Sequence, residues 1–174
     1  MMILLTGGSG CGKSSFAERL CMKSALPRYY IAAMKPYGEG GMEKVERHRR
    51  MRAGKGFETF ECYTEMEKLA LPARGTTLLE CVCNLTANEM FDETGKCSDP
   101  YERVLADVEN LRRQSETLIV VTNDVGSDAE GYSPETQAYV AVLGRINAAL
   151  AGMADTVCEL VCGIPIVLKG ALPE

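Results

Sequence analysis

Residues 7–14 read Gly-Gly-Ser-Gly-Cys-Gly-Lys-Ser, which matches the pattern G-x-x-x-x-G-K-[ST] in full. In such a loop the glycines let backbone N–H groups curl around phosphate oxygens, and the N-terminus of the following helix adds positive potential. The Lys13 ammonium would reach the β- and γ-phosphates, and the Ser14 hydroxyl would ligate Mg²⁺. The segment therefore predicts a site for a nucleoside triphosphate, made of Gly7, Gly8, Ser9, Gly10, Cys11, Gly12, Lys13 and Ser14.

Two acidic residues follow apolar runs, where the magnesium partner of such a loop is expected. Glu80 ends the run 78–80, and Asp124 follows the run 118–121 after two polar residues. A carboxylate at the end of a strand beside the loop can bind Mg²⁺ or hold one of its waters. We favour Glu80, because Asp124 lies further into a loop. For either residue the alternative is a solvated acid at a strand end.

The single histidine of the chain, His48, lies in a strongly basic segment. Residues 43–55 hold six lysines and arginines against two glutamates. On a helix, Lys44, His48 and Arg52 share one face, because they are spaced four residues apart. Nearby cations favour the neutral imidazole, which is a competent nucleophile toward phosphorus, and the arginines would hold a triphosphate. The alternative is a solvated basic helix with an incidental histidine.

Short apolar runs alternate with longer amphipathic segments, which is typical of an α/β domain with a mostly parallel sheet. We expect strands at residues 2–6, 29–33, 57–62, 77–82, 118–122, 156–162 and 164–168. We expect helices at residues 14–23, 42–52, 85–91, 101–113 and 134–153. Gly163 predicts a tight hairpin that makes the final strand antiparallel. Without a repeat or a linker, residues 1–174 form one domain, and its ligands should bind at the carboxyl ends of the strands.

Composition and charge exclude several classes of protein. The chain is 46% hydrophobic and 25% charged, which is ordinary for a globular domain. We expect neither a membrane span nor a secretory signal, since no run approaches about 20 apolar residues and no basic segment precedes an apolar one. The net charge of −5 disfavours general nucleic-acid binding. The eight cysteines include no C-x-x-C pair, which indicates reduced thiols and a cytoplasmic location.

Several segments together carry a resemblance that covers nearly the whole chain. They are residues 2–14, 17–18, 30–32, 48–52, 59–61, 78–81, 121–126, 144–147 and 163–165. In this order they resemble the bifunctional adenosylcobinamide kinase/adenosylcobinamide-phosphate guanylyltransferase family of cobalamin biosynthesis. The phosphate loop is common to many families, whereas the segments 48–52 and 122–126 are more specific.

The resemblance implies two reactions. In the first, a nucleoside triphosphate (ATP or GTP) phosphorylates the aminopropanol hydroxyl of adenosylcobinamide. In the second, His48 attacks the α-phosphorus of GTP, and the guanylyl-histidine passes GMP to adenosylcobinamide phosphate, giving adenosylcobinamide-GDP. The resemblance also implies a sheet like that of recombinase-type ATPases, a homotrimer, and a nucleotide site that includes Ala32, Ala33, Met34, Arg49, Arg50, Met51, Arg52, Glu61 and Glu80.

The chain departs from the family pattern at residues 137–141. Gln137, Val140 and Ala141 stand where the family usually has two arginines and an aspartate. These positions bear on corrinoid recognition and subunit contacts rather than on the triphosphate site. Two other readings stay open at this point, a single-activity P-loop kinase of a small molecule and a non-catalytic, recombinase-like nucleotide-binding module.

Overall fold

The computed structural model describes residues 1–36, 46, 49–50, 52–91, 98–125 and 131–173. Within these ranges seven strands form one sheet in the order β3-β2-β4-β5-β1-β6-β7. The strands are β1 (Met2–Thr6), β2 (Arg28–Ala32), β3 (Phe57–Glu61), β4 (Thr76–Glu80), β5 (Thr117–Val121), β6 (Thr156–Val161) and β7 (Ile164–Lys169). All neighbouring strands run parallel except β6 and β7. The predicted mostly parallel sheet with an antiparallel last strand is confirmed.

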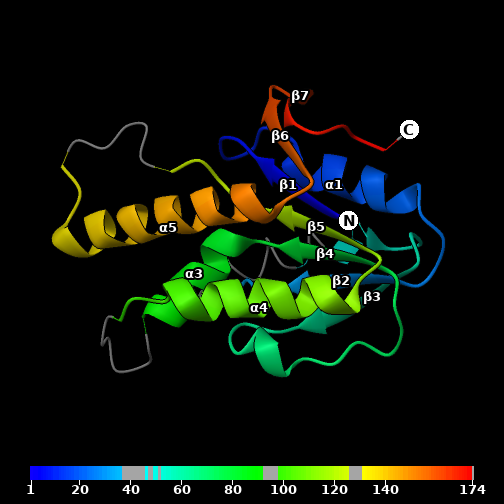
Figure 1. The fold of residues 1–174 in the computed structure, drawn as a ribbon, viewed down its shortest axis with the longest axis horizontal. Coiled ribbons are helices and arrows are strands. Elements are labelled where there is room, and N and C mark those ends of the chain that lie inside the picture. Colours follow the sequence, from blue (N-terminus) through cyan, green and yellow to red (C-terminus); the bar gives the residue numbers. More distant parts are fainter. Residues whose placement is uncertain (37–45, 47–48, 51, 92–97, 126–130, 174) are drawn as a thin grey trace.

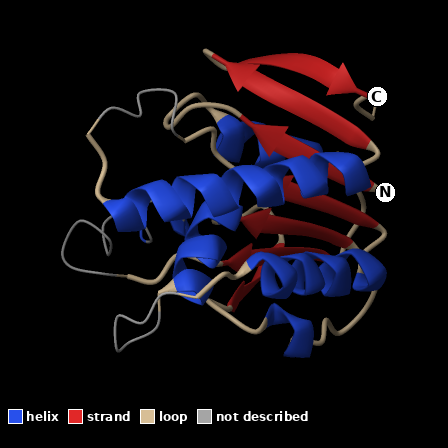
Figure 2. Ribbon diagram, turned by 60° about the vertical axis from the view of Figure 1, so that its left-hand side comes forward, coloured by secondary structure: helices blue, strands red, loops and turns tan. Residues whose placement is uncertain are grey.

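Helices cover both faces of this sheet. They are α1 (Lys13–Met22), α3 (Val82–Met90), α4 (Tyr101–Gln114) and α5 (Pro134–Met153), with the short 3-10 helix η1 (Met66–Lys68) beside α4. Helices α3, α4 and α5 pack together on one face, and α1 covers the other (Figures 1 and 2). None of the helices in the described part of the chain is long and apolar enough to cross a membrane.

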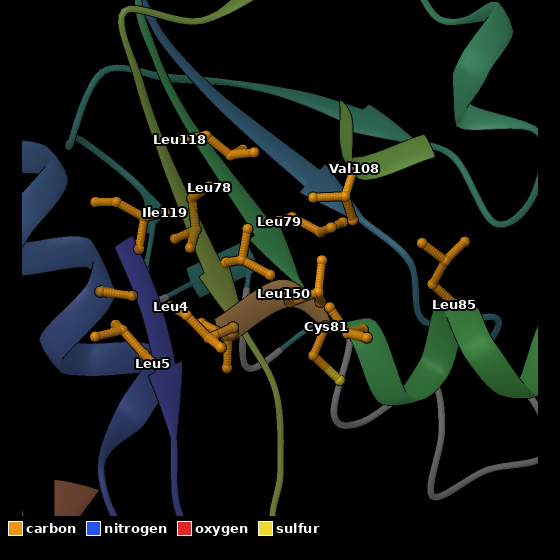
Figure 3. Packing of buried hydrophobic residues seen from close by; sticks show 14 of the residues in the cluster. Leu4, Leu5, Leu78, Leu79, Cys81, Leu85, Val108, Leu118, Ile119 and Leu150 are labelled. Carbon is orange, nitrogen blue, oxygen red and sulfur yellow. The ribbon is translucent and has the colours of Figure 1, made fainter. Parts of the chain in front are cut away.

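The core lies on both faces of the central strands, as burial of consecutive residues shows. Leu4 and Leu5 are both buried, and so are Leu78 and Leu79, although neighbours along a strand point to opposite faces. Figure 3 shows these leucines packed with side chains of β5 and of the helices, Val108 of α4 and Leu150 of α5 among them. A sheet covered on both faces explains why these strands read as continuous apolar runs.

The turn between β4 and α3 corrects the prediction at residues 77–82. The strand ends at Glu80, and α3 begins at Val82, three residues before the predicted helix at 85–91. Residues 81–83 are apolar like the strand before them, so hydropathy alone cannot locate this turn. Most of the predicted helix at 42–52 lies outside the described residues. The other predicted elements agree with the structure to within one residue at each end.

Candidate functional site

A cavity of about 560 Å³ opens at the carboxyl ends of five parallel strands. Its walls come from the segments that follow β1, β2, β3, β4 and β5. This edge of the sheet is where ligands of open α/β sheets bind. The predicted site residues that line it are Ser9, Gly10, Gly12, Lys13, Ser14, Ala32, Met34, Arg49, Arg52, Glu61 and Glu80.

Three glycines of the phosphate loop, Gly7, Gly10 and Gly12, have a positive φ that other residues avoid. Gly12 caps the N-terminus of α1 with φ of 99°, in the left-handed region. Gly7 has φ of 134°, and a Cβ atom there would lie 2.5 Å from the carbonyl oxygen of Leu160 on β6. Glycine at these two positions therefore lets the loop lie against β6 and turn into α1.

Lys13 is almost fully buried at the start of α1, with 6% of its surface exposed. Its ammonium donates hydrogen bonds to the carbonyl oxygens of Gly7 at 2.8 Å and Gly8 at 2.7 Å. Carbonyl groups of the loop thus satisfy the hydrogen-bonding needs of the Lys13 ammonium and hold its charge at the wall of the cavity. An anion in the cavity would compete with these two carbonyls for the same ammonium.

Ser14 and Glu80 meet at the floor of the cavity. The Ser14 hydroxyl donates to Oε1 of Glu80, and the Tyr30 hydroxyl donates to Oε2 of Glu80 at 2.9 Å. Within the described ranges, no three His, Cys, Asp or Glu side chains gather as a metal site. Mg²⁺ bound with a nucleotide takes only one or two protein oxygens, together with phosphates and waters. The hydroxyl of Ser14 and the carboxylate of Glu80 fit that requirement.

The alternative acid, Asp124, follows β5 and also approaches the loop. Its backbone N–H donates to the carbonyl oxygen of Gly7 at 3.3 Å. Asp124 is not among the described residues that line the cavity, whereas Glu80 is. The geometry favours Glu80 as the acid nearer to Ser14, and the choice between the two stays a prediction.

Arg52 is a second buried cation in the lining of the cavity. Its guanidinium carbon lies 3.5 Å from the centre of the Tyr30 ring, and only 7% of the residue is exposed. Nε and Nη1 of Arg52 have no hydrogen-bond partner in the described structure. A buried donor without an acceptor costs free energy, and a charged one costs more. Arg52 therefore lines the cavity as a cation whose donors are not all used by the described part of the fold.

Arg49, one residue after His48, is held at the rim of the cavity. It forms an ion pair with Glu61 at the end of β3, and the Tyr63 hydroxyl donates to the other oxygen of Glu61 at 3.1 Å. The Arg49 guanidinium is the main reason that the pKa of Glu61 is below its usual value. Both side chains are exposed, so the pair orients Arg49 more than it stabilises the fold.

The remaining predicted site residues lie elsewhere or outside the described ranges. Ala33 is buried and Arg50 is exposed, and neither lines the cavity. Gly7, Gly8 and Cys11 lie in the loop behind its cavity-facing residues. His48 and Met51 are outside the described residues, so their predicted roles are not tested by the structure.

Sequence reasoning missed several residues of the cavity wall. They are Ser15, Tyr30, Pro36, Tyr63, Cys81, Cys83, Asn84, Val121 and Asn123. Most of them follow a strand by one to four residues, which is a usable signal once the strand ends are known.

One of these residues, Cys83, has a thiol whose pKa is lowered to about 6. The main cause is a hydrogen bond with Cys81, and the backbone N–H of Asn123, which donates to the Cys83 sulfur at 3.2 Å, contributes as well.

Comparisons with known proteins agree with the expected family. The chain is 30% identical over 184 residues to the bifunctional adenosylcobalamin biosynthesis protein CobU of Escherichia coli strain K12, covering 97% of this chain and all of that protein. It is 31% identical over 178 residues to CobP, of the same description, from Pseudomonas aeruginosa, covering 98% of each.

A solved structure from Pyrococcus horikoshii OT3, titled as a structural study of PH0250, shares the fold with a TM-score of 0.57. Its identity to this chain is 8%, over 97% of this chain and 86% of that one. The model of the family described as cobinamide kinase / cobinamide phosphate guanyltransferase, CobU, matches residues 3–168. The chain belongs to this family of enzymes.

Proposed function

We propose that this enzyme phosphorylates adenosylcobinamide and then transfers GMP from GTP to the product by way of a guanylyl-histidine at His48. One observation carries the proposal. The lining of a single cavity holds both a phosphate loop and a buried arginine, Arg52, with donors that lack partners among the described residues. Two cationic groups in one cavity suit a triphosphate better than a single phosphate.

In the kinase step the aminopropanol hydroxyl oxygen forms a bond to the γ-phosphorus, and the bond from that phosphorus to the β-bridging oxygen breaks. The hydroxyl proton passes to solvent, and a nucleoside diphosphate leaves. Lys13 holds its ammonium at the loop where the β- and γ-phosphates would lie. Mg²⁺, held by Ser14 and Glu80, would neutralise charge on those phosphates when bound.

In the transferase step a nitrogen of His48 bonds to the α-phosphorus of GTP, and the bond between that phosphorus and the α–β bridging oxygen breaks. Pyrophosphate leaves with the electron pair of that bond. A phosphate oxygen of adenosylcobinamide phosphate then displaces His48 from phosphorus. Support comes from Arg49 and Arg52, which follow His48 in the sequence and line the cavity. Their guanidinium groups suit the charge that develops on pyrophosphate.

Label transfer tests the transferase step without a corrinoid. Wild-type protein incubated with α-³²P-GTP and Mg²⁺ should become labelled, whereas γ-³²P-GTP should leave no label. The phosphoramidate bond should be lost in mild acid and survive base. His48→Ala should abolish labelling while adenosylcobinamide phosphorylation persists, since the kinase step needs no imidazole. A labelled His48→Ala protein would refute this assignment.

Assembly as a homotrimer and a cytoplasmic location stay predictions from the family resemblance. The effect of Gln137, Val140 and Ala141 on corrinoid recognition is also a prediction. These residues lie in α5, and none of them lines the described cavity. The triphosphate site and its test are therefore independent of them.

A further inference from the structure

Asn88, in the last turn of α3, joins two segments that are far apart in the sequence. Its side-chain Nδ2 donates to the carbonyl oxygen of Ala33, just after β2, at 2.8 Å. The same nitrogen donates to the carbonyl oxygen of Tyr63, just after β3, at 3.0 Å. One amide group thus bridges the ends of two adjacent strands.

Both bridged segments form the wall of the cavity. Met34 and Pro36 follow Ala33 and line the cavity, and Tyr63 lines it directly. The Tyr63 hydroxyl donates to Glu61, and Glu61 pairs with Arg49. A continuous path of contacts therefore runs from Asn88 through Tyr63 and Glu61 to Arg49.

Helix α3 itself is fixed to the floor of the cavity. It begins at Val82, two residues after Glu80, and its residues Cys83 and Asn84 line the cavity. The backbone N–H of Ala33 donates to the carbonyl oxygen of Glu80 at 3.0 Å. The position of Asn88 is therefore set by the same element that follows Glu80, the acid bonded to Ser14.

We propose that Asn88 is a positioning residue of the nucleotide site, whose amide sets the distance between the floor of the cavity and the wall that holds Arg49. The inference rests on the proposed function, in which Arg49 and Arg52 bind the triphosphate. Asn88 does not itself line the cavity, so it acts through the segments that it joins. Its loss leaves two carbonyl groups without their donor and lets the wall segments move apart.

The chain offers a matched control in Asn110 of α4. Nδ2 of Asn110 also donates to two carbonyl oxygens, those of Met66 at 2.8 Å and Leu69 at 3.0 Å. These carbonyls belong to η1 and the residue after it, and neither residue lines the cavity. Each asparagine amide donates to two carbonyl oxygens at the same two distances. Asn88 joins two separate segments at the site, whereas Asn110 contacts a single turn away from it.

The experiment compares Asn88→Ala with Asn110→Ala by thermal unfolding and by titration with a fluorescent GTP analogue. Both variants should lose thermal stability, and Asn110→Ala should lose no more than Asn88→Ala, because the Leu69 carbonyl keeps the amide of Gln114 as a second donor. Asn88→Ala should weaken GTP-analogue binding about tenfold, whereas Asn110→Ala should change it less than about twofold. Equal changes in affinity for the two variants would overturn the proposal.

Two further variants separate hydrogen bonding from packing. Asn88→Asp keeps the shape of the side chain but removes the donor, and it should bind the analogue as weakly as Asn88→Ala. Wild-type affinity in Asn88→Asp would overturn the proposal. If Asn88→Ala does not fold, Asn88→Ser and Asn110→Ser are compared instead. Equal changes in affinity for the GTP analogue would again overturn the proposal.

A double-mutant cycle tests the path of contacts. Tyr63→Phe removes the hydroxyl that bonds to Glu61 and should weaken binding by about threefold on its own. In the Asn88→Ala background the same Tyr63→Phe change should weaken binding of the analogue little further, because the wall of the cavity has already moved. Full additivity of the two changes would contradict a shared path.

The same proteins distinguish this proposal from the proposed function. A wild-type protein that binds the analogue but never becomes labelled from α-³²P-GTP refutes the transferase step. In that case the affinity difference between the Asn88 and Asn110 variants still decides whether Asn88 positions the nucleotide site. A wild-type protein that binds no GTP analogue refutes both.

Discussion

Arg52 and Asp107 are both buried charged residues with polar atoms that lack partners in the described structure. Arg52 is 7% exposed and Asp107 is 1% exposed. Arg52 has no partner at Nε and Nη1, and Asp107 has none at Oδ2. Their surroundings differ, because Arg52 faces the cavity, whereas Asp107 lies in α4 beneath η1.

This difference shows two ways in which a fold can accommodate an incompletely bonded charge. Burial raises the pKa of the Asp107 carboxyl to about 7, so this group can lose its charge by taking up a proton as the pH falls below neutral. Arginine does not release its proton in proteins, so the guanidinium of Arg52 stays charged. An acceptor that enters the cavity, which Arg52 lines, would satisfy its unused donors. A buried charge beside a cavity therefore indicates binding, and a buried charge away from one indicates a pH-dependent stability.

Lys13 is a third buried charge, and among the changes considered its substitution should lower enzyme activity the most. Its ammonium is bonded to two carbonyls of its own loop, so the fold tolerates it without a ligand. Lys13→Ala should lower adenosylcobinamide phosphorylation on the order of 10²–10³-fold, because a charge at the transferring phosphoryl group is lost. Circular dichroism should show a folded protein. Near wild-type kinase activity in that folded variant would refute the phosphate-loop assignment.

Glu80 is the acid at the floor of the cavity, where it accepts hydrogen bonds from Ser14 and Tyr30. Glu80→Gln keeps the volume and removes the charge, so Mg²⁺-dependent activity should fall about 100-fold. Asp124→Asn serves as the comparison and should have a smaller effect. The measurement is activity as a function of Mg²⁺ concentration for both variants. If Asp124→Asn lost its activity while Glu80→Gln kept full activity, the magnesium acid would be Asp124 and not Glu80.

Arg52→Met tests the first half of the comparison directly. GTP should bind about 10–100-fold more weakly, the usual cost of losing hydrogen bonds to a charged group. The melting temperature without nucleotide should not fall, because methionine fills the space without an unsatisfied charge.

Arg28 is a suitable control for Arg52, since its guanidinium donates to the carbonyl oxygens of Ser24, Lys55 and Met22. Arg28→Met should show the opposite result, a lower melting temperature and GTP affinity within about twofold of wild type. Loss of stability in Arg52→Met with unchanged GTP affinity would mean that Arg52 is structural.

Asp107→Asn tests the second half of the comparison, with the smallest effect. The folded carboxyl titrates near pH 7 and the unfolded one near its ordinary value of 3.8, so the folded state binds more protons between these values. Wild-type stability should therefore fall as pH rises through that window. At pH 4 the free energy of unfolding of Asp107→Asn should equal that of wild type or be slightly lower. By pH 8 it should exceed that of wild type by about 1–3 kcal/mol. A stability difference that does not change with pH would contradict the burial argument.

The sequence predicted the sheet well and the site only in part. Apolar runs predict the strands because both faces of the sheet are covered, and Pro134, suited to a first helical turn, predicts the start of α5. The phosphate loop was predicted because its pattern is local. The contact between Arg52 and Tyr30, and the bridge made by Asn88, join residues distant in sequence, and no local pattern signals them. The turn at Cys81 was missed because the apolar run continues across it.

The most direct test of the central claim, that this cavity binds GTP for transfer of its guanylyl group to His48, is the intact mass of the protein after incubation with GTP and Mg²⁺. Wild-type protein should gain the mass of one guanylyl group, which is GMP less one water. His48→Ala should gain nothing, and Arg52→Met should gain it only at higher GTP concentrations. A wild-type protein that binds GTP and keeps its original mass would contradict the account and favour a kinase with a single activity.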